Sequence, residues 1–200
     1  MQLIKIGLSL MIGCMFYSCS AQLNKAVNET ERALTLAAYN DSIIKSLQER
    51  YDLLIGYATT SDRPGFYKKH FLVGINKNKS VAFRYILTLV RTNNEAPFVL
   101  DSIPVPEILR DSIISNYVQI KAWEIYRSED ENTSQCSDIV KHSGCKIVDA
   151  ETYQLIVTTK SGHRSSSFYA PEYYEKCCPG NEDRRRFLRL VNIIEKVFSH

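Results

Sequence analysis

The sequence predicts a single α+β domain in which helices cover one face of an antiparallel sheet. Residues 66–75 and 81–90 are rich in aromatic and β-branched side chains and flank a polar turn, which is typical of a β-hairpin. Further antiparallel strands are expected over residues 145–148, 153–159 and 164–169. Near the C-terminus, apolar side chains recur at helical spacing, which predicts an amphipathic helix. These side chains are Phe187, Leu190, Val191, Ile194 and Phe198.

Before the hairpin, the chain is expected to be helical over residues 23–50. Apolar residues fall three or four apart there, and the segment has neither proline nor glycine. A break is expected near Asn40, with Asp41 or Ser42 capping a second helix. Residues 51–58 either extend that helix or begin the sheet. The polar residues 59–65 then form a loop.

Between the two groups of strands, a short strand is expected over residues 98–100 and a helix over 107–117. The apolar side of this helix is formed by Ile108, Leu109, Ile113 and Tyr117. Another strand is expected over 118–126, ending in an acidic turn at 128–132. After the last strand, Asn181 is expected to cap the C-terminal helix, whose first turn has the acidic charge that suits a helix start.

The first 22 residues have the layout of an export signal. Lys5 supplies a positive charge, residues 6–17 are apolar apart from Ser9, and small residues follow. The apolar part is too short for a stable membrane span. Ordinary cleavage after Ala21 is one expectation. Cleavage before Cys19, with that cysteine carrying lipid, is the other.

The sequence Phe16-Tyr17-Ser18-Cys19 resembles a lipobox, and residues 18–22 are similar to the signal ends of small lipoproteins from Bacteroidota. The resemblance is limited to this region. It implies that residues 1–18 are removed and that several acyl chains, such as palmitate, anchor the protein to a membrane of the cell envelope, facing the periplasm or the exterior. Two or more chains give stable anchoring. Met11-Ile12-Gly13-Cys14 is a second candidate.

Residues 19–30 are polar enough to serve as a tether, and residues 31–200 are expected to form the domain. The composition, with 44% apolar and 24% charged residues, is that of a folded globular chain. The formal net charge is only +3. Such a weak charge gives no support for binding to nucleic acid.

Four cysteines remain after processing: Cys136, Cys145, Cys177 and Cys178. An even number in an exported chain indicates disulfide bonds. Because adjacent cysteines rarely bond to each other, Cys177 and Cys178 are each expected to pair with Cys136 or Cys145, in an order that the sequence leaves open. Each bridge would contribute about 3 to 4 kcal/mol. A local Cys136–Cys145 bridge is the alternative.

The same cysteines, together with His142, allow two other interpretations. A zinc site needs converging thiolate and imidazole ligands, but the spacing matches no familiar finger. A Cys136–His142 nucleophile pair would need an orienting third group that the sequence does not indicate. The acidic run 129–131 lacks the glycine of a calcium loop. No metal and no cofactor are therefore expected.

Two further groups of charged or titratable side chains are expected to be structural. Arg184, Arg185 and Arg186 should form a solvated helix face with some salt bridges. His70 is expected to be a half-exposed strand residue and His163 a solvated turn residue.

The most promising binding residues are Tyr169, Tyr173 and Tyr174, because tyrosine offers a stiff contact area with a polar tip. The alternative is that they only pack over the sheet beside the disulfide bonds. The sequence therefore predicts an exported, lipid-anchored envelope protein that binds a partner, for example another envelope protein, and is not an enzyme. A secreted or periplasmic hydrolase-like enzyme with dispersed catalytic residues is the alternative, and a purely structural lipoprotein is a third.

Overall fold

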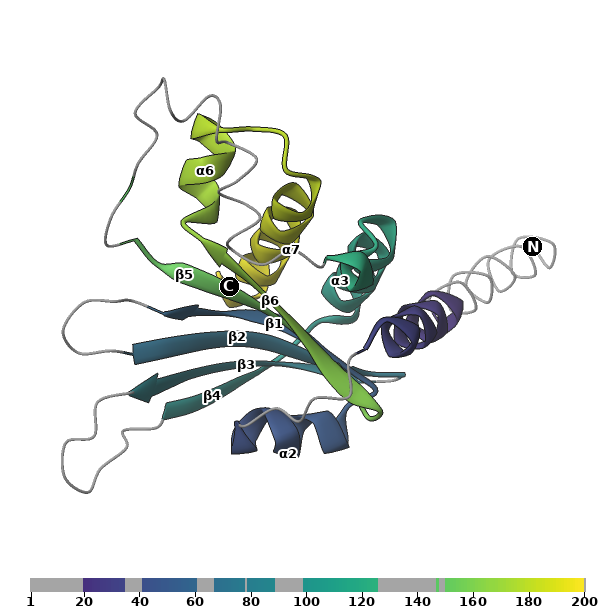
Figure 1. Ribbon diagram of the computed structural model, residues 1–200. Coiled ribbons are helices and arrows are strands. Elements are labelled where there is room, and N and C mark those ends of the chain that lie inside the picture. Colours follow the sequence, from purple (N-terminus) through teal and green to yellow (C-terminus); the bar gives the residue numbers. More distant parts are fainter. Residues whose placement is uncertain are drawn as a thin grey trace, which may run out of the picture.

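Six antiparallel strands form one sheet in the order β4-β3-β2-β1-β5-β6 (Figure 1). The computed structural model describes residues 20–34, 41–60, 67–77, 79–88, 99–125, 147 and 150–199. The strands are β1 Leu53–Thr60, β2 Tyr67–Asn76, β3 Lys79–Thr88, β4 Val99–Pro104, β5 Thr152–Thr159 and β6 Gly162–Tyr169. The α+β class and the antiparallel sheet are as predicted.

Helices precede the sheet in the chain, interrupt it and follow it. Residues 20–33 are helical. The other helices are α2 Ser42–Arg50, α3 Glu107–Gln119, the short 3₁₀ helix η1 Ala122–Glu124, α6 Pro171–Cys177 and α7 Glu182–Phe198. In Figure 1, α3 and α7 lie on one side of the sheet and α2 lies on the other.

Strand β1 is one of the two central strands of the sheet, paired with β2 on one side and β5 on the other. Every residue from Leu53 to Thr59 is buried, because helices cover both faces at this strand. A strand buried on both faces is apolar without alternation, so periodicity cannot distinguish it from a helix. This explains why residues 51–58 could not be assigned from sequence. In the structure Tyr51 caps the end of α2, and residues 53–58 belong to strand β1.

The larger core lies between the sheet and α3, α7 and the 20–33 helix. Phe187 of α7 is fully buried and stacks on Phe168 of β6, with 4.6 Å between ring centroids. The predicted apolar stripe of α7 faces this core, since its other members are also buried or packed against it. The C-terminal amphipathic helix is thus confirmed.

The smaller core lies on the opposite face, under α2. Ile44 and Leu47 of α2 pack with Leu54, Leu72 and other residues of the sheet. Helices therefore cover both faces, and not one face as expected. The ring of Tyr51 lies directly over Gly74, where a Cβ atom would come within 2.6 Å of the ring.

Both predicted helix caps are present. The Asp41 carboxylate accepts hydrogen bonds from the backbone N–H groups of Ile43 and Ile44, at 2.9 and 3.2 Å. The Asn181 side chain accepts one from the N–H of Arg184 at 2.9 Å. These bonds satisfy donors that a helix start leaves without an intrahelical partner.

The strand expected over 118–126 is wrong in its described part. Helix α3 continues to Gln119, and a left-handed residue, Lys121 with φ 49°, leads into η1. The carbonyl groups of Trp123 and Ile125 accept hydrogen bonds from side chains of β6, not from a neighbouring strand. Apolar and β-branched composition suggested a strand, but tertiary packing decided the backbone.

Ile108 was expected on the apolar side of α3, but it is 79% exposed.

The N-terminal boundary of the folded domain also differs from the expected one at residue 31. Leu23, Ala26 and Thr30 are buried, and the Thr30 hydroxyl lies 2.7 Å from that of Tyr117. The described part of the expected tether, residues 20–30, is thus a helix packed on the domain.

Several predicted features lie outside the described residues. They are the signal 1–18, Cys19, most of the 59–65 loop, the acidic turn 128–132, and the 145–148 strand apart from Ile147, which is not in a strand. Within the described ranges, no helix has the length and apolar character needed to cross a membrane.

Candidate functional site

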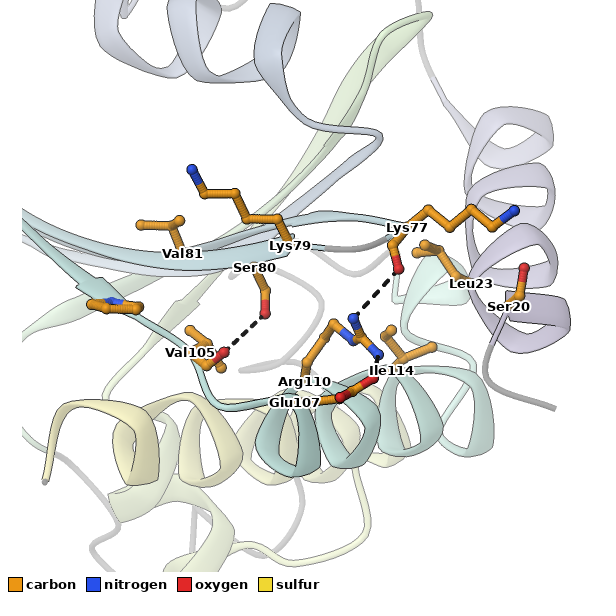
Figure 2. Close-up of a pocket in the computed structure, with 11 residues that line it drawn as sticks. Ser20, Leu23, Lys77, Lys79, Ser80, Val81, Val105, Glu107, Arg110 and Ile114 are labelled. Atoms are coloured by element: carbon orange, nitrogen blue, oxygen red, sulfur yellow. Dashed lines mark hydrogen bonds and ion pairs between the residues drawn. The ribbon is translucent and has the colours of Figure 1, made fainter. Parts of the chain in front are cut away.

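A pocket of about 460 Å³ opens where three parts of the chain meet (Figure 2). These parts are the start of the 20–33 helix, the turn between β2 and β3, and the connection from β4 into α3. The volume lies in the range usual for small-molecule sites. The described lining residues are Ser20, Leu23, Lys77, Lys79, Ser80, Val81, Pro104, Val105, Glu107, Arg110 and Ile114.

Arg110 holds the wall of this pocket together. Its guanidinium donates to Glu107 Oε1 at 3.0 Å, to Asp111 Oδ1 at 2.9 Å and to the carbonyl oxygen of Lys77 at 3.4 Å. Its side chain is only 9% exposed. Arg110 therefore ties the β2–β3 turn to α3, while the two carboxylates compensate its positive charge.

The rim of the pocket is basic. Lys77 and Lys79 are exposed, and neither pairs with an acidic side chain among the described residues. In Figure 2 the side chain of Lys77 extends toward the helix that carries Ser20 and Leu23, whereas that of Lys79 leaves the turn in another direction. Lys77 therefore places a positive charge at the mouth, which favours an anionic ligand, whereas the Lys79 side chain points away from it.

The rest of the described lining is mostly apolar. Leu23, Val105 and Ile114 are buried, and Ser80 donates its hydroxyl hydrogen to the carbonyl oxygen of Val105. No histidine, cysteine or aspartate is among the described lining residues. This arrangement is suited to binding an amphiphilic anion.

The structure brings the three predicted binding tyrosines together at another corner, where β6 ends and α6 begins. The Tyr173 and Tyr174 rings meet edge to face at 5.4 Å, and Tyr174 lies 6.4 Å from Tyr169. The Tyr169 hydroxyl accepts from the N–H of Ala150 at 3.1 Å. All three side chains are half-buried. We call this group the tyrosine corner.

Cys177 and Cys178 follow the tyrosines at the end of α6, and both are disulfide-bonded. Cys178 is buried and Cys177 half-buried. The expected partners Cys136 and Cys145 lie outside the described residues, as does His142. The order of pairing therefore stays a prediction.

The arginine run divides in two. Arg185 and Arg186 pair with Glu182 at 2.7 and 3.2 Å, as expected for a solvated face. Arg184 is only 1% exposed, so the expectation of a solvated side chain is wrong there. Its guanidinium donates to Glu175 at 2.9 Å and to the Cys178 carbonyl, which ties α6 to α7.

The histidines also differ from expectation. His70 is fully buried, with its Nε2 3.7 Å from the Asp41 carboxylate, and was expected to be half-exposed. Burial and the nearby Lys68 lower the pKa of His70 to about 4, although Asp41 opposes this shift. Partial burial also lowers the pKa of His163. In the described part of the chain, no group of three or more His, Cys, Asp or Glu residues is placed to hold a metal ion.

No protein-family model and no curated protein sequence matches this chain. The site must therefore be interpreted from its own residues. Sequence reasoning selected the tyrosines but missed the pocket, because its walls come from three segments of the chain, separated at Leu23 to Lys77 and at Val81 to Pro104. The only local signal was the pair of lysines in the polar turn of the hairpin, and such turns are commonly charged without a ligand.

Proposed function

We propose that this chain is an exported cell-envelope protein, held at a membrane by lipid on Cys19, that binds a partner and does not catalyse a reaction. The tyrosine corner carries the binding part of this proposal. Tyr169, Tyr173 and Tyr174 come from two elements and gather beside two disulfide-bonded cysteines. A clustered, partly exposed aromatic group on a cross-linked support is suited to recognition, because little side-chain entropy is lost on binding.

The character of the pocket supports the non-enzymatic part. Its described ionisable residues are lysines, an arginine held by carboxylates, and Glu107. This set favours binding of charge over transfer of protons.

The anchor can be tested on the native protein by intact-mass and N-terminal peptide analysis. An acylated Cys19 is the expected result. A mature chain that begins at unmodified Gln22 would contradict the anchor, as would one that begins at Met1.

The partner-binding surface can be tested by mild crosslinking in the native envelope, followed by purification and quantitative mass spectrometry. We expect one envelope protein to be enriched with the unchanged chain and lost with Tyr173→Ala. Lys176→Ala, an exposed change in the same helix, is the matched control. Equal enrichment with both variants would contradict binding at the tyrosine corner.

A further inference from the structure

The pocket beside Ser20 combines an apolar wall with a basic rim. Leu23, Val105 and Ile114 supply buried apolar surface, and Lys77 supplies an exposed positive charge. A free anion such as phosphate would leave the apolar wall without a partner, and a neutral hydrocarbon would leave Lys77 without one. The combination suits a molecule that has an acyl chain and an anionic headgroup.

The position of the pocket in the chain indicates where such a molecule would come from. Ser20 lines the pocket and is the residue directly after Cys19. Consecutive Cα atoms are about 3.8 Å apart in any trans conformation. A lipid attached to Cys19 would therefore hold this pocket at the membrane surface, with no long tether in between because Leu23 is already in the core.

We propose that the pocket binds an anionic phospholipid of the anchoring membrane, with its phosphate at Lys77 and the upper part of one acyl chain against Leu23, Val105 and Ile114. The choice of a membrane lipid rests on the proposed anchor at Cys19. Arg110 is a positioning residue in this site. Its carboxylate partners compensate its charge, and its bond to the Lys77 carbonyl fixes the turn that carries Lys77.

The test uses the mature chain, residues 19–200, with Cys19→Ser, so that no attached lipid contributes to membrane binding. Short-chain phosphatidylglycerol below its micelle concentration is titrated by calorimetry, beside glycerol phosphate and inorganic phosphate. Flotation with phosphatidylcholine vesicles, with and without phosphatidylglycerol, measures membrane binding. We expect saturable binding of the short-chain lipid, weaker binding of both phosphates, and flotation only with the anionic vesicles.

Two pairs of matched variants locate the binding. Lys77→Glu should weaken lipid binding by about fivefold or more, since a lysine near an anionic surface contributes about 1 kcal/mol. Lys45→Glu changes the net charge equally at an exposed position away from the pocket and should leave binding unchanged. Ser20→Trp should block the mouth, whereas Asn24→Trp, exposed on the same helix, should not.

The proposal is overturned if short-chain phosphatidylglycerol does not bind, if inorganic phosphate binds as tightly, or if Lys77→Glu and Lys45→Glu weaken binding equally. These outcomes do not depend on whether Cys19 is acylated in the native protein. An unmodified Cys19 in the native protein contradicts the anchor but not measured lipid binding in the pocket. Failure of the lipid to bind contradicts the pocket but not acylation.

Discussion

The two faces of the sheet are built from alternate residues of the same strands, yet they differ in kind. On the larger face, α7, α3 and the 20–33 helix enclose an aromatic core in which Phe187 stacks on Phe168. On the smaller face, the nine-residue α2 covers only part of the sheet, and beside it lie buried His70 and half-buried Lys68. The buried arginines of the larger face, Arg110, Arg164 and Arg184, donate to carboxylates or carbonyl oxygens, whereas the smaller face carries a buried histidine whose pKa is lowered.

This difference shows how the area covered by helices sets what a sheet can tolerate. A long amphipathic helix such as α7 removes a whole row of side chains from water, which favours large apolar residues. Where cover is short, polar side chains persist at the edge of the core and must be kept neutral or paired. Changes on the larger face should therefore act mainly through packing, and those on the smaller face partly through charge.

The largest effect is expected on the larger face. Phe187→Ala should lower the free energy of unfolding by about 3 to 5 kcal/mol, because it removes a fully buried ring and leaves a cavity. Urea denaturation followed by circular dichroism measures this. Ile108→Ala, at a 79% exposed position, is the control and should stay within about 0.5 kcal/mol. A smaller loss of unfolding free energy for Phe187→Ala than for a variant in α2 would contradict this ranking of the two faces.

Acid should weaken the smaller face through His70. Its pKa is lowered to about 4 in the folded protein, against an ordinary value of 6.5. Between these pH values the unfolded chain binds a proton on His70 that the folded protein does not. The contribution of neutral His70 to the free energy of unfolding is therefore fully present above pH 6.5 and is lost as the pH falls toward 4. The loss should be roughly 3 kcal/mol.

The measurement compares unfolding free energies from pH 7 to pH 4 in the unchanged chain and in His70→Gln. The Asp41 carboxylate and the Lys68 ammonium face His70 and stay in both proteins, so the difference between the two curves reports His70 itself. His163→Gln, at a less buried histidine, should change the curve less. Parallel curves for the unchanged chain and His70→Gln would contradict the prediction.

Leu47→Ala tests the packing of the smaller face directly. It should cost about 2 to 3 kcal/mol, at the low end for a buried leucine, because α2 is short and the neighbouring sheet can partly fill the gap. Lys45→Ala, exposed on the same helix, is the control for helix propensity. Thermal unfolding should show Leu47→Ala less stable than the control but more stable than Phe187→Ala.

The smallest effects are expected at the caps, one for each face. Asp41→Ala removes two hydrogen bonds at the start of α2, and Asn181→Ala removes one at the buried start of α7. Each should cost about 1 kcal/mol, with Asn181 toward 2 because the donor that it leaves unsatisfied is buried. Asp41→Asn keeps the cap and should restore most of the loss at neutral pH. If it does not, the charge of Asp41 matters more than its hydrogen bonds.

Local signals determined much of this fold. Capping residues at 41 and 181, the stripe of α7 and the alternation of β6 are each encoded within a few positions, so sequence alone placed them. The burial of Arg184 was not predictable in this way, because its partners Glu175 and Cys178 reach it only through the turn between α6 and α7. The tyrosine corner was accessible to sequence analysis because its residues lie within one short segment.

What the sequence by itself determined is the α+β class, the caps of α2 and α7 and the hairpins, whereas export stays a prediction. Only the tertiary structure decided that β1 is a strand, that residues 118–125 are not, and that helices cover both faces. It alone also made the pocket, by placing Ser20 beside Lys77 and Arg110. The physical reason is that capping and periodicity act over one or two turns of chain, whereas burial and cavity shape depend on contacts between distant segments.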